Sequence, residues 1–199
     1  RPFDVRGATG DGPLPMLAAL GATTVRTYGG DPGPILDAAD KAGLKVIAGL
    51  WVGQPRQGAD YGDRAFVGRQ LAELQATVEK YRNHPALLMW GIGNEVEVEL
   101  ADDAPVWPAI EQVAQMVRRL DPAHPTMGVL AETGSDKVGK LRTQAPSIQV
   151  LGLNSYGDAL YSAASRARAQ GWEGPIVVTE LGALGQWQAA QAPWGAPFE

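Results

Sequence analysis

The sequence predicts an α/β protein whose parallel strands form a (β/α)8 barrel. Apolar, β-branched segments alternate with amphipathic helical patterns along nearly the whole chain. Strands that are apolar on both faces and separated by helices require a parallel sheet covered by those helices. Residues 6–12 lack both the G-x-G-x-x-G and the G-x-x-x-x-G-K-[ST] spacing of phosphate-binding turns. A TIM barrel is therefore favoured over a doubly wound sheet.

Seven segments are candidate strands, the first of them weaker than the rest. They are residues 3–6, 23–27, 45–52, 86–92, 126–130, 149–153 and 175–179. Two helical stripes show apolar side chains at alternating steps of four and three, namely Val67, Leu71, Leu74, Val78 and Tyr81, and Ile110, Val113, Val117 and Leu120. Each stripe should face the sheet.

Helix stop signals occur at regular places. Gly21, Gly43 and Gly171 are predicted to end helices, and Pro85, Pro125, Pro146 and Pro175 to open the return to the next strand. A complete barrel typically needs about 250 residues, whereas this chain has 199 and seven candidate strands. We therefore expect one domain, residues 1–199, truncated before the eighth strand, with residues 186–199 as a long loop.

Composition excludes several classes of function. The chain is 45% hydrophobic and 20% charged, as in globular proteins, and its net charge of −5 includes no basic stripe for nucleic acid. It has no cysteine and only two distant histidines, so we expect no metal site and no cofactor.

The sequence says little about location. No apolar run approaches the roughly 20 residues of a membrane span. The chain starts with Arg1 and shows no signal segment, so its start is predicted to be processed or cut from something longer. The compartment stays open, with a secreted or periplasmic location slightly favoured, and so does the oligomeric state.

Three glutamates follow apolar strands: Glu95, Glu132 and Glu180. Reactive groups of a parallel barrel lie where strands end, although a lone glutamate there is more often solvated. Glu95 and Glu180 both end strongly apolar strands, so both should point into one mouth, while Glu132 remains a rival or a substrate contact. Two carboxyls about 5–5.5 Å apart support glycosidic cleavage by double displacement. Repulsion between two neighbouring carboxylates favours a state in which one is ionised and the other carries a proton, so the two can take different roles.

The motifs around these glutamates resemble a known family. YRNHP at 81–85 and MWGIGNE at 89–95 resemble the acid/base strand of clan A glycoside hydrolases, closest to the family 2 catalytic domain, and TELG at 179–182 resembles their nucleophile strand. The resemblance spans roughly residues 3–185. It implies a retaining hydrolase of β-glycosidic bonds, with Glu95 as acid/base and Glu180 as nucleophile.

The same resemblance implies roles for other residues. Arg26 is similar to the arginine that keeps the nucleophile ionised, and Asn94 to the asparagine that binds the hydroxyl next to the anomeric carbon. Tyr156 is similar to the tyrosine that donates a hydrogen bond to the nucleophile. Asn154 is either a second sugar contact or a loop residue.

Aromatic residues add a separate indication. Tyr28, Trp51 and Trp187 follow candidate strands, where flat side chains would stack on the C–H faces of sugar rings, whereas Trp90 lies within a strand and suits the core. We therefore expect an oligosaccharide or polysaccharide substrate. The loop acids Glu97, Glu99, Asp102 and Asp103 are expected to be mostly solvated, with some lining further sugar subsites.

Alternatives stay open. They are transglycosylation on the same site, a non-catalytic saccharide-binding barrel and an unrelated barrel enzyme. An aldolase would need a lysine at a strand end, but Lys45 begins its strand. Family 2 enzymes also usually carry β-sandwich domains before the barrel, and nothing here resembles them. Sugar identity and linkage are not encoded in any motif found.

Overall fold

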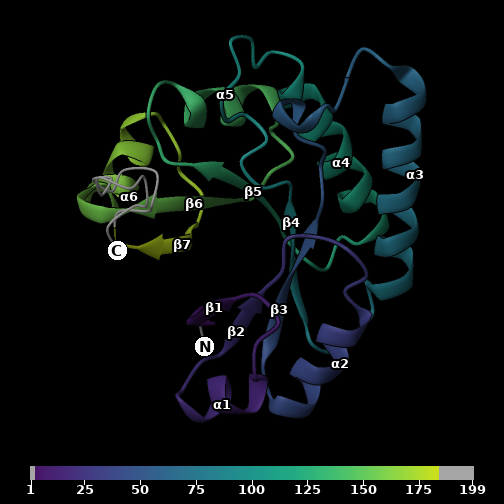
Figure 1. Ribbon diagram of the computed structural model, residues 1–199, viewed down its shortest axis with the longest axis vertical. Helices are drawn as coiled ribbons and strands as arrows, with labels where there is room; N and C mark the ends of the chain where they lie inside the picture. Colours follow the sequence, from purple (N-terminus) through teal and green to yellow (C-terminus); the bar gives the residue numbers. More distant parts are fainter. Residues whose placement is uncertain (1–2, 184–199) are drawn as a thin grey trace, which may run out of the picture.

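The computed structural model describes residues 3–183 and confirms the predicted barrel. Its seven strands form one parallel sheet in sequence order, and the sheet curves with the helices on its outer side (Figure 1). The strands are β1 Gly7–Thr9, β2 Thr24–Arg26, β3 Lys45–Leu50, β4 Leu87–Ile92, β5 Thr126–Ala131, β6 Val150–Tyr156 and β7 Ile176–Gly182. The helices are α1 Leu14–Ala19, α2 Gly33–Ala42, α3 Arg64–Tyr81, α4 Val106–Leu120, α5 Lys137–Gln144 and α6 Leu160–Ala169, with short 3₁₀ turns η1 Pro55–Gln57 and η2 Gly157–Ala159.

The helical stripes pack as the sequence predicts. Leu74 and Val78 of α3, and Ile110, Val113 and Val117 of α4, are buried in the core between helices and sheet. Gly21, Gly43 and Gly171 all have positive φ, the left-handed conformation that ends a helix at little cost only for glycine. None of the helices within residues 3–183 has both the length and the apolar character needed to cross a membrane.

The first strand is not where the sequence predicted it. The expected strand at residues 3–6 is wrong, because β1 begins at Gly7 and ends at Thr9. A Cβ on Gly7 would lie 1.7 Å from the carbonyl oxygen of Thr24, so β1 approaches β2 too closely for any side chain there. An apolar pattern could not predict this strand, because its first residue must be a glycine to fit against the backbone of β2.

The two ends of the sheet face each other. The Thr9 hydroxyl in β1 donates to the carbonyl oxygen of Thr179 in β7, at 3.2 Å. A cavity of about 1050 Å³ extends between these strands and into the barrel, and its lining includes Arg26, Tyr28, Tyr156 and Glu180. The near-closure of the barrel thus brings β2 and β7 to one site.

A β-bulge shapes that site. Leu153 pairs with Val178, but Asn154 pairs with Glu180, so Thr179 is an extra residue in β7. An extra residue re-aims the side chains that follow it, and bulges are common beside active sites.

Candidate active site

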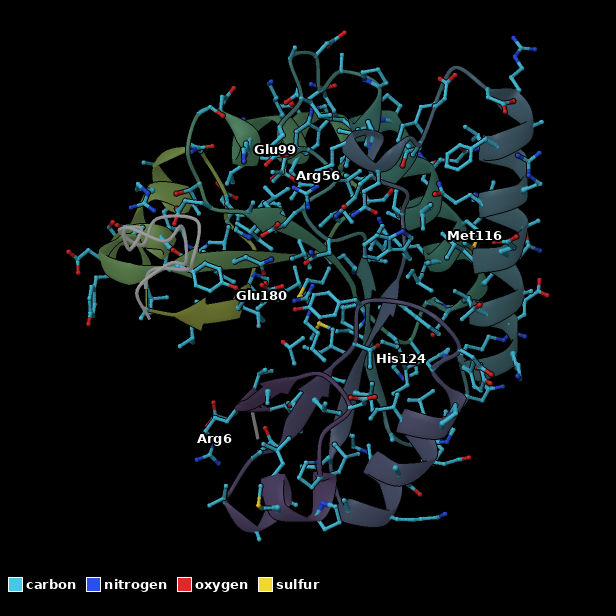
Figure 2. The ribbon with its side chains drawn as sticks, in the orientation of Figure 1. Arg6, Arg56, Glu99, Met116, His124 and Glu180 are labelled. Carbon is cyan, nitrogen blue, oxygen red and sulfur yellow. The ribbon has the colours of Figure 1, made fainter. Side chains whose placement is uncertain are left out.

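Among residues 3–183, three side chains donate hydrogen bonds to Glu180. Its Oε1 accepts from Arg26 Nη1 at 3.1 Å and from the Tyr28 hydroxyl at 2.9 Å. Its Oε2 accepts from the Tyr156 hydroxyl at 2.6 Å. Glu180 lies within β7 rather than after it, and Figure 2 labels it beside that strand. These donors fix the positions of both carboxyl oxygens of Glu180.

Arg26, the last residue of β2, is enclosed by protein. Its side chain is only 5% exposed, and its Nη2 donates to Asn94 Oδ1 at 2.7 Å. Its guanidinium also lies 4.7 Å from the centre of the Tyr28 ring. Arg26 is therefore placed to fix Glu180, Asn94 and Tyr28 relative to one another.

Glu95 lies in the tight loop after β4. Its φ is 51°, and its backbone N–H donates to the carbonyl oxygen of Val129 in β5 at 3.1 Å. Left-handed backbone at a glutamate costs free energy, and such strain persists where the surroundings over-determine the conformation. The Glu95 side chain accepts from Asn154 Nδ2 at 2.9 Å through Oε1, while Arg56 Nη2 lies 3.7 Å from Oε2.

Asn154 links the segment of Glu95 to the segment of Glu180. It is a buried residue of β6, so its interpretation as a loop residue is wrong. Its Nδ2 donates to Asn94 Oδ1 at 3.2 Å as well as to Glu95, and its Oδ1 accepts from the Thr179 hydroxyl at 2.7 Å. The Asn154 side-chain amide thus bonds to Glu95, in the loop after β4, and to Thr179, the residue before Glu180.

The two tyrosines on Glu180 are held in their protonated form. Burial, followed by the hydrogen bond to Glu180, raises the pKa of Tyr28 to about 12. The same two causes raise the pKa of Tyr156 well above its usual value. Both hydroxyls therefore stay donors across the neutral range.

The predicted aromatic platform is only partly described. Tyr28 and Trp51 follow β2 and β3 and are 37% and 38% exposed, so both present surface at the strand ends. The Tyr28 hydroxyl, however, is bound to Glu180, a contact that the sequence did not predict. Trp187 lies outside the described residues.

Sequence reasoning missed Arg56 and Gln54, both in the loop after β3. Gln54 is buried, its Nε2 donates to the carbonyl oxygen of Asn94 at 2.6 Å, and its Oε1 accepts from Arg56 Nε at 3.2 Å. Figure 2 labels Arg56, the residue that reaches Glu95. Their place after a strand was the available signal, because loops after strands line the active face of a barrel.

Glu97 corrects another expectation. It was expected with the solvated loop acids, but its side chain is fully buried and accepts from Ala131 N at 3.0 Å, with Lys137 Nζ 3.2 Å away. Burial raises the pKa of Glu97, and the nearby Lys137 opposes that shift. Glu97 ties the loop of Glu95 to the end of β5. Within residues 3–183, no cluster of three His, Cys, Asp or Glu could hold a metal ion.

The rival carboxylate, Glu132, has different partners. It accepts from Ser155 and Thr133 and pairs with Arg166 of α6. Burial alone would raise the pKa of Glu132, but the hydrogen bonds together lower it below its usual value. These contacts join β5, β6 and α6.

Comparison with known proteins finds a family model that matches most of the chain. The family model of glycosyl hydrolases family 2, TIM barrel domain, matches residues 16–173. A β-glucuronidase of Chlorocebus aethiops is 27% identical over 165 residues, which are 77% of this chain and 23% of that protein. A β-galactosidase of Bacteroides ovatus is 29% identical over 145 residues, 71% of this chain and 16% of that protein. The chain therefore spans only a minor part of these relatives.

Solved structures share the fold. The Ruminococcus gnavus β-glucuronidase superposes with a TM-score of 0.67 at 20% identity, over 98% of this chain and 38% of that one. The β-galacturonidase of Eisenbergiella tayi gives 0.66 at 20%, over 91% and 33%. Because the family model spans most of the chain, from α1 to the residues before β7, this protein belongs to glycosyl hydrolases family 2 through its TIM barrel domain.

Proposed function

We propose that this chain is the catalytic barrel of a retaining β-glycoside hydrolase, with Glu180 as nucleophile and Glu95 as acid/base. One observation carries the proposal: two carboxylates 85 residues apart in the sequence (180 − 95) share a single hydrogen-bonded frame. In that frame, Arg26 bonds to both Glu180 and Asn94. Asn154 bonds to both Glu95 and Thr179, the residue before Glu180. Residues 1–199 are proposed to form one domain.

In the first step, an oxygen of Glu180 bonds to the anomeric carbon as the bond to the leaving oxygen breaks. Glu95 gives its proton to that leaving oxygen, so the products are a glycosyl ester and a free alcohol. In the second step, water attacks the anomeric carbon and Glu95 takes its proton. The ester bond then breaks and Glu180 returns to the carboxylate form.

The surroundings of each carboxyl suit these roles. Arg26, Tyr28 and Tyr156 stabilise an ionised Glu180. Asn94 is linked to Glu180 through Arg26 and to Glu95 through Asn154, and its amide is proposed to bind the hydroxyl next to the anomeric carbon. Relatives named β-glucuronidase and β-galactosidase support a β-linked sugar as substrate, within an oligosaccharide or polysaccharide.

Transfer to a second sugar instead of water uses the same first step, so it remains the alternative within this site. A non-catalytic saccharide-binding barrel would not require a carboxylate that lines the cavity and is held by three donors. Product analysis with and without a sugar acceptor separates hydrolysis from transfer.

The test is covalent trapping. The full chain is incubated with a panel of aryl β-glycosides, and then with 2-fluoro sugars of the sugars that react, followed by peptide mass analysis. A fluorosugar adduct on Glu180 is expected. An adduct on another residue, or none from any sugar while the protein is folded, would overturn the proposal.

Glu95→Gln tests the acid role. Because only poor leaving groups need the proton, turnover of natural β-glycosides should fall about 100-fold or more, while aryl glycosides with good leaving groups should lose far less in the first step. Steady-state kinetics with both substrate types measures the difference. Equal losses on both would exclude Glu95 as the acid.

A further inference from the structure

The donors on Glu180 are unequally arranged over its two oxygens. Oε1 accepts from both Arg26 Nη1 and the Tyr28 hydroxyl, at 3.1 and 2.9 Å, whereas Oε2 accepts from Tyr156 at 2.6 Å. The family resemblance gives a role to one tyrosine, Tyr156. The second phenol was expected to stack on a sugar ring.

Tyr28 is held where a donor to Oε1 must be. It lies two residues after Arg26, just beyond the end of β2, and the Arg26 guanidinium lies 4.7 Å from the centre of its ring. Such a cation–π contact restrains the ring. Arg26 is itself fixed by Asn94, so the Tyr28 hydroxyl belongs to the same frame as the two carboxyls.

We propose that Tyr28 is a positioning residue that, together with Arg26, holds Oε1 as the non-attacking oxygen of Glu180 and leaves Oε2 to bond to the anomeric carbon. The inference rests on the proposed function. A carboxylate oxygen has two lone pairs for hydrogen bonding. Two donors on Oε1 occupy both of them.

The hydrogen bond from Tyr28 should affect the rates of the two steps differently. When Oε2 bonds to the anomeric carbon, Glu180 loses its charge and Oε1 becomes the ester carbonyl oxygen. In the second step water attacks the anomeric carbon, Glu95 takes its proton, the Oε2–carbon bond breaks and negative charge returns to the carboxylate. A donor on Oε1 stabilises that returning charge. Tyr28 should therefore assist breakdown of the glycosyl ester more than its formation.

The Tyr28 hydroxyl can serve this purpose throughout the working pH range. Burial and the contact with Glu180 raise the pKa of Tyr28 to about 12, so it remains a neutral donor. Tyr28→Phe removes only this donor and keeps the ring over Arg26.

The experiment compares Tyr28→Phe with the wild-type full chain on an aryl β-glycoside with a good leaving group, using steady-state and burst kinetics. Loss of one such donor should lower kcat about 10-fold or more, while kcat/KM, which reports ester formation, changes much less and KM falls. Intact-protein mass should show glycosylated protein accumulating. Tyr161→Phe, on an exposed residue of α6 (89% exposed), is the matched control and should behave as wild type.

Several outcomes would contradict the role of Tyr28. Unchanged kcat, or equal losses in kcat and kcat/KM at an unchanged melting temperature, would overturn it while trapping of Glu180 in the wild type upholds the proposed function. Failure of the folded wild type to form any Glu180 adduct would overturn both. Circular dichroism and the melting temperature of Tyr28→Phe separate these results from misfolding.

Discussion

At the scale of single residues, similar positions lead to different roles. Glu132 directly follows β5 and Glu180 lies near the end of β7, yet Glu180 lines the cavity with Arg26 and two tyrosines, whereas Glu132 is bonded to Ser155 and Arg166. Glu132 has a φ of 42°, so its backbone also turns away from the strand direction. We interpret Glu132 as a link between β5, β6 and α6.

Glu132→Gln tests this link through the pH dependence of the free energy of unfolding. Hydrogen bonds lower the pKa of Glu132 in the folded protein, so its carboxylate stabilises the fold above the pKa of an unfolded glutamate, about 4.3, and that stability is lost as pH falls through the lower folded value. Urea denaturation should show wild type more stable than Glu132→Gln at pH 7, with the gap closing towards pH 3. Ser155→Ala removes one donor to Glu132, so at pH 7 it should lower the free energy of unfolding by less than Glu132→Gln does. A gap that does not change with pH would contradict this interpretation.

At the scale of elements, tight strand packing supports the site. Gly49 of β3 pairs with Gly91 of β4, and a Cβ on Gly49 would lie 2.4 Å from the carbonyl oxygen of Thr27. The segment that carries Tyr28 therefore lies directly against β3. The bulge at Thr179 plays a matching part in β7, because it lets Thr179 bond Asn154 while the next residue, Glu180, meets Arg26.

Two glycine substitutions test this packing. Gly49→Ala should lower the free energy of unfolding by about 1–3 kcal/mol through overpacking, and should lower activity because it displaces the Tyr28 segment. Gly68→Ala is the matched control: Gly68 lies on the exposed side of α3 with no atom within 4 Å of an added Cβ. It should stabilise the helix by about 0.5–1 kcal/mol. Urea denaturation measures both, and a neutral Gly49→Ala would show that β3 can shift freely.

At the scale of the whole molecule, the site depends on the two ends of the sheet meeting. β1 and β7 are adjacent in space although they begin and end the described sheet (Figure 1). The Thr9 to Thr179 hydrogen bond and the Arg26 to Glu180 ion pair both cross that junction. The hydrogen-bonded network around the proposed catalytic residues thus depends on the sheet curving until β1 and β7 face each other.

Thr9→Val tests the contribution of closure. It keeps the shape of the side chain but removes the donor to Thr179, so the free energy of unfolding should fall by about 1 kcal/mol. Trapping of Glu180 should also slow, because β7 loses a restraint beside the proposed nucleophile. Thr9→Ser keeps the hydroxyl and should retain both stability and trapping rate. Loss of stability in both variants alike would point to packing of the methyl group instead.

The sequence by itself determined the alternation of strands and helices, the glycines that end helices, and the strands that position Glu95 and Glu180. These features follow from local periodicity and backbone preference, which each segment encodes in its own residues.

Only the tertiary structure decided the start of β1, the burial of Glu97, the contact of Arg56 with Glu95 and the hydrogen bond from Tyr28 to Glu180. Each of these depends on the register between strands, on a bulge or on the closing of the sheet. Such relations join residues far apart in the chain, so no local pattern specifies them.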